Sequence, residues 1–156
     1  MEKFLENLQD ASKSIRTLDH MIYVTFPLIQ DKKMLLNILL ETKNAIQKLI
    51  NSILQYEYLY KRINLYKNPQ TNFETFINNC SKVYKIDQDE MKKIFELFDL
   101  AKKHKISSME FVRNEKIVIL GENSSHDVVT VGKTKEFILI AKKILEKVQK
   151  RMERDI

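Results

Sequence analysis

The sequence predicts a mainly all-α fold, a helical bundle of about five helices with a small β-hairpin near residues 116–130. The chain of 156 residues contains only two glycines and two prolines, whereas folds built from strands need many turn residues. Apolar residues recur at alternating steps of four and three over long stretches, which is the spacing of one helix face. Hydrophobic residues make up 44% of the chain, enough to bury a core, and no linker-like stretch divides it. We therefore expect one helical-bundle domain spanning residues 1–156.

The first predicted helix runs from about Glu2 to Thr25. Pro27 is expected to end it, because proline lacks a backbone N–H and restricts the residue before it. The apolar run Met21–Ile29, which overlaps the end of this helix, is too short to cross a membrane, which takes about 20 residues. Its apolar character on all sides suggests burial between elements or in a dimer interface. The seam of this helix consists of Phe4, Leu8, Ala11, Ile15, Leu18 and Ile22.

The second predicted helix is the longest, because its seam continues without glycine or proline. Asp31 is placed to cap its start, and Asn68-Pro69 is expected to end it. A continuous helix of this length spans about 50 Å at 1.5 Å per residue; a break near Asn51-Ser52 is the alternative. Its seam consists of Leu35, Leu39, Thr42, Ile46, Leu49, Ile53, Tyr56, Tyr60 and Ile63.

Three further helices and one extended region complete the prediction. A helix over about 70–84 buries Cys80 and Val83, and the next helix opens with Asp87 and Glu90 in capping-box spacing. That helix buries Met91, Ile94, Phe95, Phe98 and Ala101. The β-branched run at 116–120, the turn cluster at 121–125 and the run at 127–130 predict the hairpin. Thr130 is placed to cap the last helix, which runs to about Glu153 and buries Phe137, Ala141, Ile144, Val148 and Met152.

Most enzyme and metal templates are missing from the sequence. One cysteine and three separated histidines argue against a structural metal site, so we expect neither a metal nor a cofactor. The sequence has no glycine-rich phosphate loop and no nucleophile elbow. With no visible signal peptide or membrane segment, a cytoplasmic location and no membrane partner are expected.

One polar cluster is a candidate catalytic or phosphate-binding site. Arg16, Asp19, His20 and Tyr23 lie at spacings of three and four, so they share one helix face. An imidazole beside a carboxylate and a phenol can move a proton, and the guanidinium can bind phosphate. The alternative is an ordinary hydrogen-bonded helix surface.

Two basic groups are candidate nucleic-acid contacts. Lys61 and Arg62 are interleaved with tyrosines, and such pairings can neutralise phosphates and stack on bases. Lys143, Lys147 and Lys150 lie on the last helix, where residues 131–156 hold eight basic and four acidic side chains out of a total net charge of +6. Aromatic packing and ordinary solvated helix faces are the competing explanations.

The stretches Leu18–Pro27 and Tyr56–Ile63 resemble uncharacterised small helical proteins of archaeal type. The layout is also similar to HEPN domains, whose active members cleave RNA with an arginine followed, after four to six residues, by a histidine. Here Arg16 and His20 are separated by three residues, and Arg113 and His126 by twelve. The resemblance therefore implies the bundle without the catalytic pair.

The sequence thus favours a non-catalytic interaction module over an enzyme. Such a module binds a protein partner, a second copy of itself as a homodimer, or RNA. The alternative is a HEPN-like ribonuclease or nucleotide-processing enzyme that uses Arg16 and His20.

Overall fold

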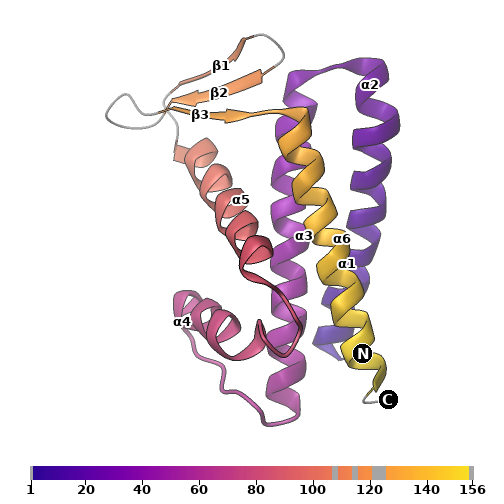
Figure 1. The fold of residues 1–156 in the computed structure, drawn as a ribbon, viewed down its shortest axis with the longest axis vertical. Helices are drawn as coiled ribbons and strands as arrows, with labels where there is room; N and C mark the ends of the chain where they lie inside the picture. Colours follow the sequence, from indigo (N-terminus) through magenta and orange to yellow (C-terminus); the bar gives the residue numbers. More distant parts are fainter. Residues whose placement is uncertain (1, 107–108, 114–115, 121–125, 155–156) are drawn as a thin grey trace.

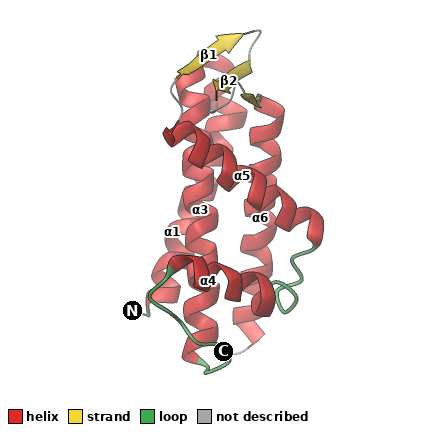
Figure 2. Ribbon diagram, turned by 90° about the vertical axis from the view of Figure 1, so that its left-hand side faces the viewer, coloured by secondary structure: helices red, strands yellow, loops and turns green. Residues whose placement is uncertain are grey.

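The described part of the chain is a bundle of helices with a small sheet at one end. The structure, a computed structural model, describes residues 2–106, 109–113, 116–120 and 126–154. Three long helices, α1 (Lys3–His20), α3 (Lys32–Leu59) and α6 (Val131–Arg154), run side by side, and α5 (Gln88–Ile106) crosses them obliquely (Figure 1). The short helix α4 (Pro69–Thr75) lies far from the sheet (Figure 2). The predicted fold class, mainly α-helical, is therefore confirmed.

The first helical stretch continues beyond its predicted end through a π-helical turn. After α1 come a π-helical segment, η1 (Met21–Thr25), and a single further turn, α2 (Phe26–Ile29). Pro27 sits at the start of that last turn, where its missing N–H is not needed. The prediction that Pro27 ends the helix is therefore wrong, because the wider turn lets the helix restart around it.

The long helix is continuous but shorter than predicted. Asp31 caps α3 by accepting a 2.9 Å hydrogen bond from the Lys33 amide, as predicted. The helix passes through Asn51 and Ser52 without a break and ends at Leu59. Asn68 does not end this helix; its side chain caps α4 by accepting a 2.9 Å bond from the Gln70 amide.

The last two long helices start as the sequence predicts. The capping box is present in both directions: Asp87 N–H donates to Glu90 Oε1 at 3.0 Å, and Glu90 N–H donates to Asp87 Oδ1 at 2.8 Å. Thr130 Oγ1 accepts a 3.0 Å bond from the Lys133 amide at the start of α6. Between α4 and α5 lies a second π-helical segment, η2 (Phe76–Cys80), which the periodicity did not predict.

The predicted hairpin is confirmed as part of a larger antiparallel sheet. Strand β2 (Lys116–Leu120) pairs with β3 (His126–Val129), while the predicted turn at 121–125 lies outside the described residues. A strand that was not predicted, β1 (Met109–Arg113), pairs with the other side of β2. The sheet buries Ile117, Ile119 and Val129 and so packs on the bundle. This packing stabilises the strands, because an isolated hairpin is only marginally stable in water.

One hydrophobic cluster draws residues from the long helices, η2 and the sheet. The seam of α3 is buried from Leu35 to Tyr56, mainly against α1 and α6. Three residues assigned to the core are exposed instead: Tyr60, Val83 and Phe95. Within the described ranges, no helix combines the length and the apolar character needed to cross a bilayer.

Candidate nucleic-acid interface

A buried carboxylate links Arg62, from the first predicted basic group, to the helix that carries the second group. Glu57, in the last turn of α3, is only 3% exposed. Its Oε2 accepts a 2.9 Å bond from Arg62 Nη1, and its Oε1 lies 3.5 Å from Nε of Arg151 on α6. The end of α3 and the C-terminal half of α6 lie at the same end of the bundle (Figure 1). Glu57 therefore brings cations far apart in the sequence into one place.

Tyr84 completes the environment of Glu57. Its hydroxyl donates a 2.9 Å hydrogen bond to Glu57 Oε1, and the Arg151 guanidinium lies 5.9 Å from the centre of its ring. Burial, together with the negative charge of Glu57, raises the pKa of Tyr84 far above its usual value. The same two causes raise the pKa of the neighbouring Cys80 thiol to about 12. Tyr84 is therefore a neutral hydrogen-bond donor, and Cys80 an unreactive buried thiol.

A small hollow lies beside this network, and four of its six lining residues are cationic. It has a volume of about 280 Å³. Lys147 donates a 2.8 Å hydrogen bond to the carbonyl oxygen of Lys85 and pairs with the buried carboxylate of Glu90. The residues that line the hollow are Val83, Tyr84, Lys85, Lys147, Lys150 and Arg151. We call the six cations of this region, Lys61, Arg62, Lys85, Lys147, Lys150 and Arg151, the basic end.

Two lysines of the basic end occupy left-handed backbone positions. Lys61 has φ of 61° and Lys85 has φ of 57°. Each closes a Schellman turn: Arg62 N–H donates to Glu57 O at 3.0 Å, and Ile86 N–H donates to Ser81 O at 2.8 Å. Glycine is the usual residue at such a position, since a side chain there costs about 1 kcal/mol. Both turns therefore carry a charged side chain where stability alone favours glycine.

The charges of the basic end are only partly compensated. Arg62 and Arg151 face Glu57, Lys147 faces Glu90, and Lys150 pairs at 3.1 Å with Glu146 on the same helix. Lys61 and Lys85 are exposed and form no ion pair with any described side chain. The buried carboxylates hold three cations in place, and the exposed lysines add charge around them.

Not every predicted basic residue belongs to this site. Lys61, Arg62, Lys147 and Lys150 are brought together, whereas Lys143 is exposed on α6 and does not line the hollow. Sequence reasoning missed Glu57, Tyr84 and Lys85 as parts of a site. Glu57 gave one usable signal, because it follows Ile53 by four residues and so falls on the buried face of its helix.

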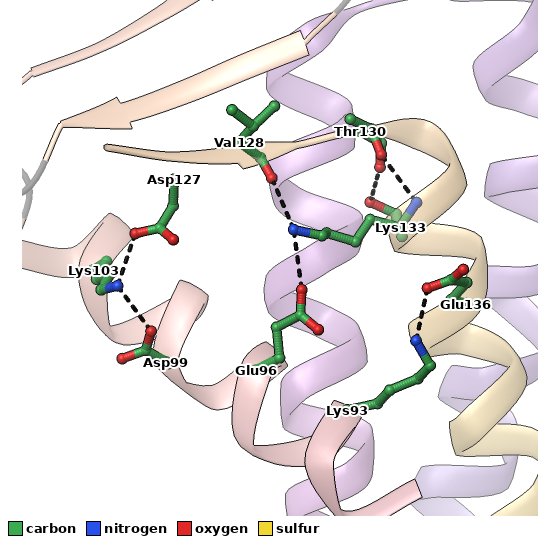
Figure 3. Close-up of polar contacts among 10 residues, drawn as sticks. Lys93, Glu96, Asp99, Lys103, Asp127, Val128, Thr130, Lys133 and Glu136 are labelled. Carbon is green, nitrogen blue, oxygen red and sulfur yellow. Dashed lines mark hydrogen bonds and ion pairs between the residues drawn. The ribbon is translucent and has the colours of Figure 1, made fainter. Parts of the chain in front are cut away.

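Three cations elsewhere on α5 and α6, Lys93, Lys103 and Lys133, form ion pairs within the protein. Lys133 lies 3.0 Å from Glu96 and Lys93 lies 2.9 Å from Glu136, while Lys103 lies between two carboxylates (Figure 3). Lys103 Nζ lies 2.9 Å from Asp99 and 2.7 Å from Asp127 of β3. Hydrogen bonds to these two carboxylates raise the pKa of Lys103. These ion pairs join α5 to α6 and to the sheet, and the carboxylates neutralise the charges of the three lysines.

The polar cluster of α1 and η1 faces α6 without forming an enclosed site. Asp19 is paired with Lys142, and Lys135 lies 4.9 Å from the centre of the Tyr23 ring. Arg16 and His20 are exposed on the same stretch of helix. The structure thus recruits two lysines to the cluster, and none of the described cavities includes any of its four predicted members.

Within the described ranges, no group of three histidine, cysteine or carboxylate side chains is placed to hold a metal ion. Comparison with known proteins adds no family: no family model, no curated protein and no solved structure matches this chain.

Proposed function

We propose that this protein is a non-catalytic helical module that binds RNA through its basic end. The observation that supports this proposal is the convergence of Lys85, Lys147, Lys150 and Arg151 around one hollow, next to Lys61 and Arg62. Phosphate groups are held by clustered lysine and arginine side chains, and each neutralised phosphate releases counterions.

Aromatic residues beside these cations favour a single strand over a duplex. Tyr58, Tyr60 and Tyr66 are each about half exposed. The Arg62 guanidinium lies 4.9 Å from the centre of the Tyr60 ring, so a cation and a ring are presented together. Unpaired bases stack on exposed aromatic rings, and this stacking tolerates many sequences.

The experiment measures the affinity of a fluorescein-labelled single-stranded RNA of twelve nucleotides by anisotropy, between 50 and 200 mM salt. We expect Lys85→Glu/Lys150→Glu to weaken binding about tenfold or more and to flatten the salt dependence, because phosphate contacts are lost. The matched control is Lys13→Glu/Lys33→Glu, which changes the charge equally at exposed sites outside the hollow. Equal effects of the two pairs, or no binding at 50 mM salt, would contradict the proposal.

A protein contact is a second candidate, and a different surface favours it. Val24, Leu28 and Ile29 are exposed at the end of the first helical stretch, and Leu28 is 83% exposed. The α3 seam from Leu35 to Tyr56, by contrast, is buried inside the bundle, so its side chains are not available to a partner. A homodimer, if formed, would therefore use the tip around Leu28.

The HEPN-like ribonuclease remains the alternative from the enzyme class. Lys135 and Lys142 beside the Arg16–Tyr23 stretch would suit a phosphate there. In activated nucleophile–base pairs a third group orients the base, whereas no described residue forms a hydrogen bond or ion pair with His20. Binding without cleavage is therefore the better-supported proposal.

A further inference from the structure

Another cavity shares no lining residue with the basic hollow and has different chemistry. It is a cleft of about 780 Å³ between α3, α4 and α5, a volume typical of small-molecule sites. Its lining contains no charged side chain. The residues that line it are Gln47, Ile50, Asn51, Leu54, Gln55, Leu65, Pro69, Gln70, Asn72, Phe73, Phe95 and Phe98.

Amide side chains form one wall of the cleft. Gln47, Asn51 and Gln55 follow one another at steps of four, so they lie in a row along α3. Gln47 Nε2 donates to Asn51 Oδ1 at 3.1 Å, which leaves the amide N–H groups of Asn51 and the carbonyl of Gln47 for a ligand. Gln55 Oε1 accepts a 2.9 Å bond from Asn7, which leaves the amide N–H groups of Gln55. The row therefore offers donors and an acceptor side by side.

Phenylalanine rings from α4 and α5 also line the cleft. The Phe73 ring packs edge-on against Phe95 at 5.8 Å between ring centres and lies 5.7 Å from Phe98. Phe95 is 44% exposed although it sits on a helix with a well-filled core face. A planar ligand in the cleft could stack on the exposed face of this ring, and the stacking would favour the bound state.

The cleft is connected to the basic end by one loop. Leu65 lines the cleft, and the loop that carries it begins at Lys61 and Arg62. Asn72, which also lines the cleft, holds Tyr66 through two 2.8 Å bonds to its backbone N–H and C=O. The segment that follows α3 therefore runs from two cations of the basic end to the cleft, and Asn72 fixes its backbone at Tyr66.

We infer that this cleft binds a nucleobase of the RNA strand whose phosphates contact the basic end, an inference that rests on the proposed function. Amides recognise the hydrogen-bonding edge of a base, and phenylalanine stacks on its face. The uncharged lining suits a base and would leave a phosphate unpaired. The basic end binds the backbone, and the cleft supplies preference among bases.

The test uses the same RNA with 2-aminopurine at one position and two variants, Asn51→Leu and Phe95→Leu. Each is expected to weaken binding about tenfold and to abolish the change in 2-aminopurine fluorescence, with the salt dependence unchanged because no phosphate contact is lost. The matched controls, Asn37→Leu on α3 and Leu139→Ala on α6, alter exposed residues outside the cleft and should change nothing.

Failure of this inference is distinguishable from failure of the proposed function. RNA that binds wild type and both variants equally, with no fluorescence change, overturns the base site and leaves the basic end intact. If wild type does not bind the RNA, binding of free 2-aminopurine riboside tests whether the cleft is a base site. Saturable binding lost in Phe95→Leu supports the cleft as a base site, and absence of binding at millimolar riboside overturns it.

Discussion

The Tyr84 hydroxyl donates a 2.9 Å hydrogen bond to Glu57 Oε1, across 27 residues of sequence and inside the protein. A buried carboxylate is unfavourable unless it is paired and hydrogen-bonded. Tyr84, Arg62 and Arg151 together provide the hydrogen bond and the ion pairs that the buried Glu57 carboxylate requires. The same carboxylate fixes the positions of the two arginines of the basic end. The cations are therefore positioned before any ligand arrives.

Removing the Tyr84 hydroxyl should destabilise the protein. Tyr84→Phe is expected to lower the free energy of unfolding by about 2 kcal/mol, because a hydrogen bond to a buried charged group is lost. Urea denaturation at neutral pH measures it. The control, Tyr58→Phe, alters a residue of α3 that is 53% exposed and should change stability by less than about 0.5 kcal/mol. Equal effects would mean that the Glu57 network is not stabilising.

Stability should fall at alkaline pH, in part because of Cys80. The folded pKa of its thiol is about 12, against an ordinary value of 9.0. Between these values the unfolded chain loses a proton that the folded protein keeps, so stability declines as pH rises from about 9. At pH 10 this amounts to about 1.4 kcal/mol. In Cys80→Ala the difference between urea unfolding at pH 7 and pH 10, under reducing conditions, should be smaller by about that amount; an unchanged difference would contradict the burial argument.

Glycine at the two left-handed lysines should separate stability from binding. Lys61→Gly and Lys85→Gly are each expected to raise the free energy of unfolding by up to about 1 kcal/mol, because a positive φ is strained for lysine. Both should weaken RNA binding by removing a cation. Lys143→Gly, in the middle of α6, is the control and should lower stability by about 1 kcal/mol. If the glycine variants bind RNA as well as wild type, these lysines are not contacts.

Self-association should depend on the exposed tip of the first helical stretch. If the protein forms the homodimer described under the proposed function, light scattering at high concentration should give twice the monomer mass. Leu28→Glu should then restore the monomer without loss of helix content, since Leu28 is 83% exposed. A dimer that persists in Leu28→Glu would place the interface elsewhere. A wild-type protein that is monomeric would contradict the homodimer.

The histidine of α1 should be dispensable. Incubation of the protein with labelled RNA is expected to give no cleavage products, and His20→Ala should bind RNA with wild-type affinity. Cleavage by wild type that His20→Ala reduces by about 100-fold or more would instead support the ribonuclease alternative.

Features decided by neighbouring residues were predictable from the sequence. Asp31, Thr130 and the Asp87–Glu90 pair cap their helices as predicted, because a cap needs only a side chain and an amide two or three positions away. The buried face of α6 followed from its periodicity for the same reason. The hairpin was predicted from its β-branched runs, whereas β1 depends on pairing with β2 and was missed.

Features decided by packing were not predictable. The end of α3 at Leu59 is set by a Schellman turn at a lysine, where periodicity alone continues to Ile63. Phe95 follows the helical spacing but faces the cleft, since the α4 region leaves that side open. The sequence supplied four of the six cations of the basic end. Their convergence depends on Glu57 and Tyr84, which come from segments far apart in the chain.

The placement of α6 against α1 and α3 has a consequence for folding during synthesis. These two helices can pair as a local hairpin soon after Leu59 emerges from the ribosome. The face of that hairpin that receives Ile144 and Val148 stays uncovered while the chain up to α6 is made. At about 5–20 residues per second this interval lasts several seconds. The nascent chain therefore exposes an apolar groove to chaperones and to neighbouring chains until its last long helix arrives.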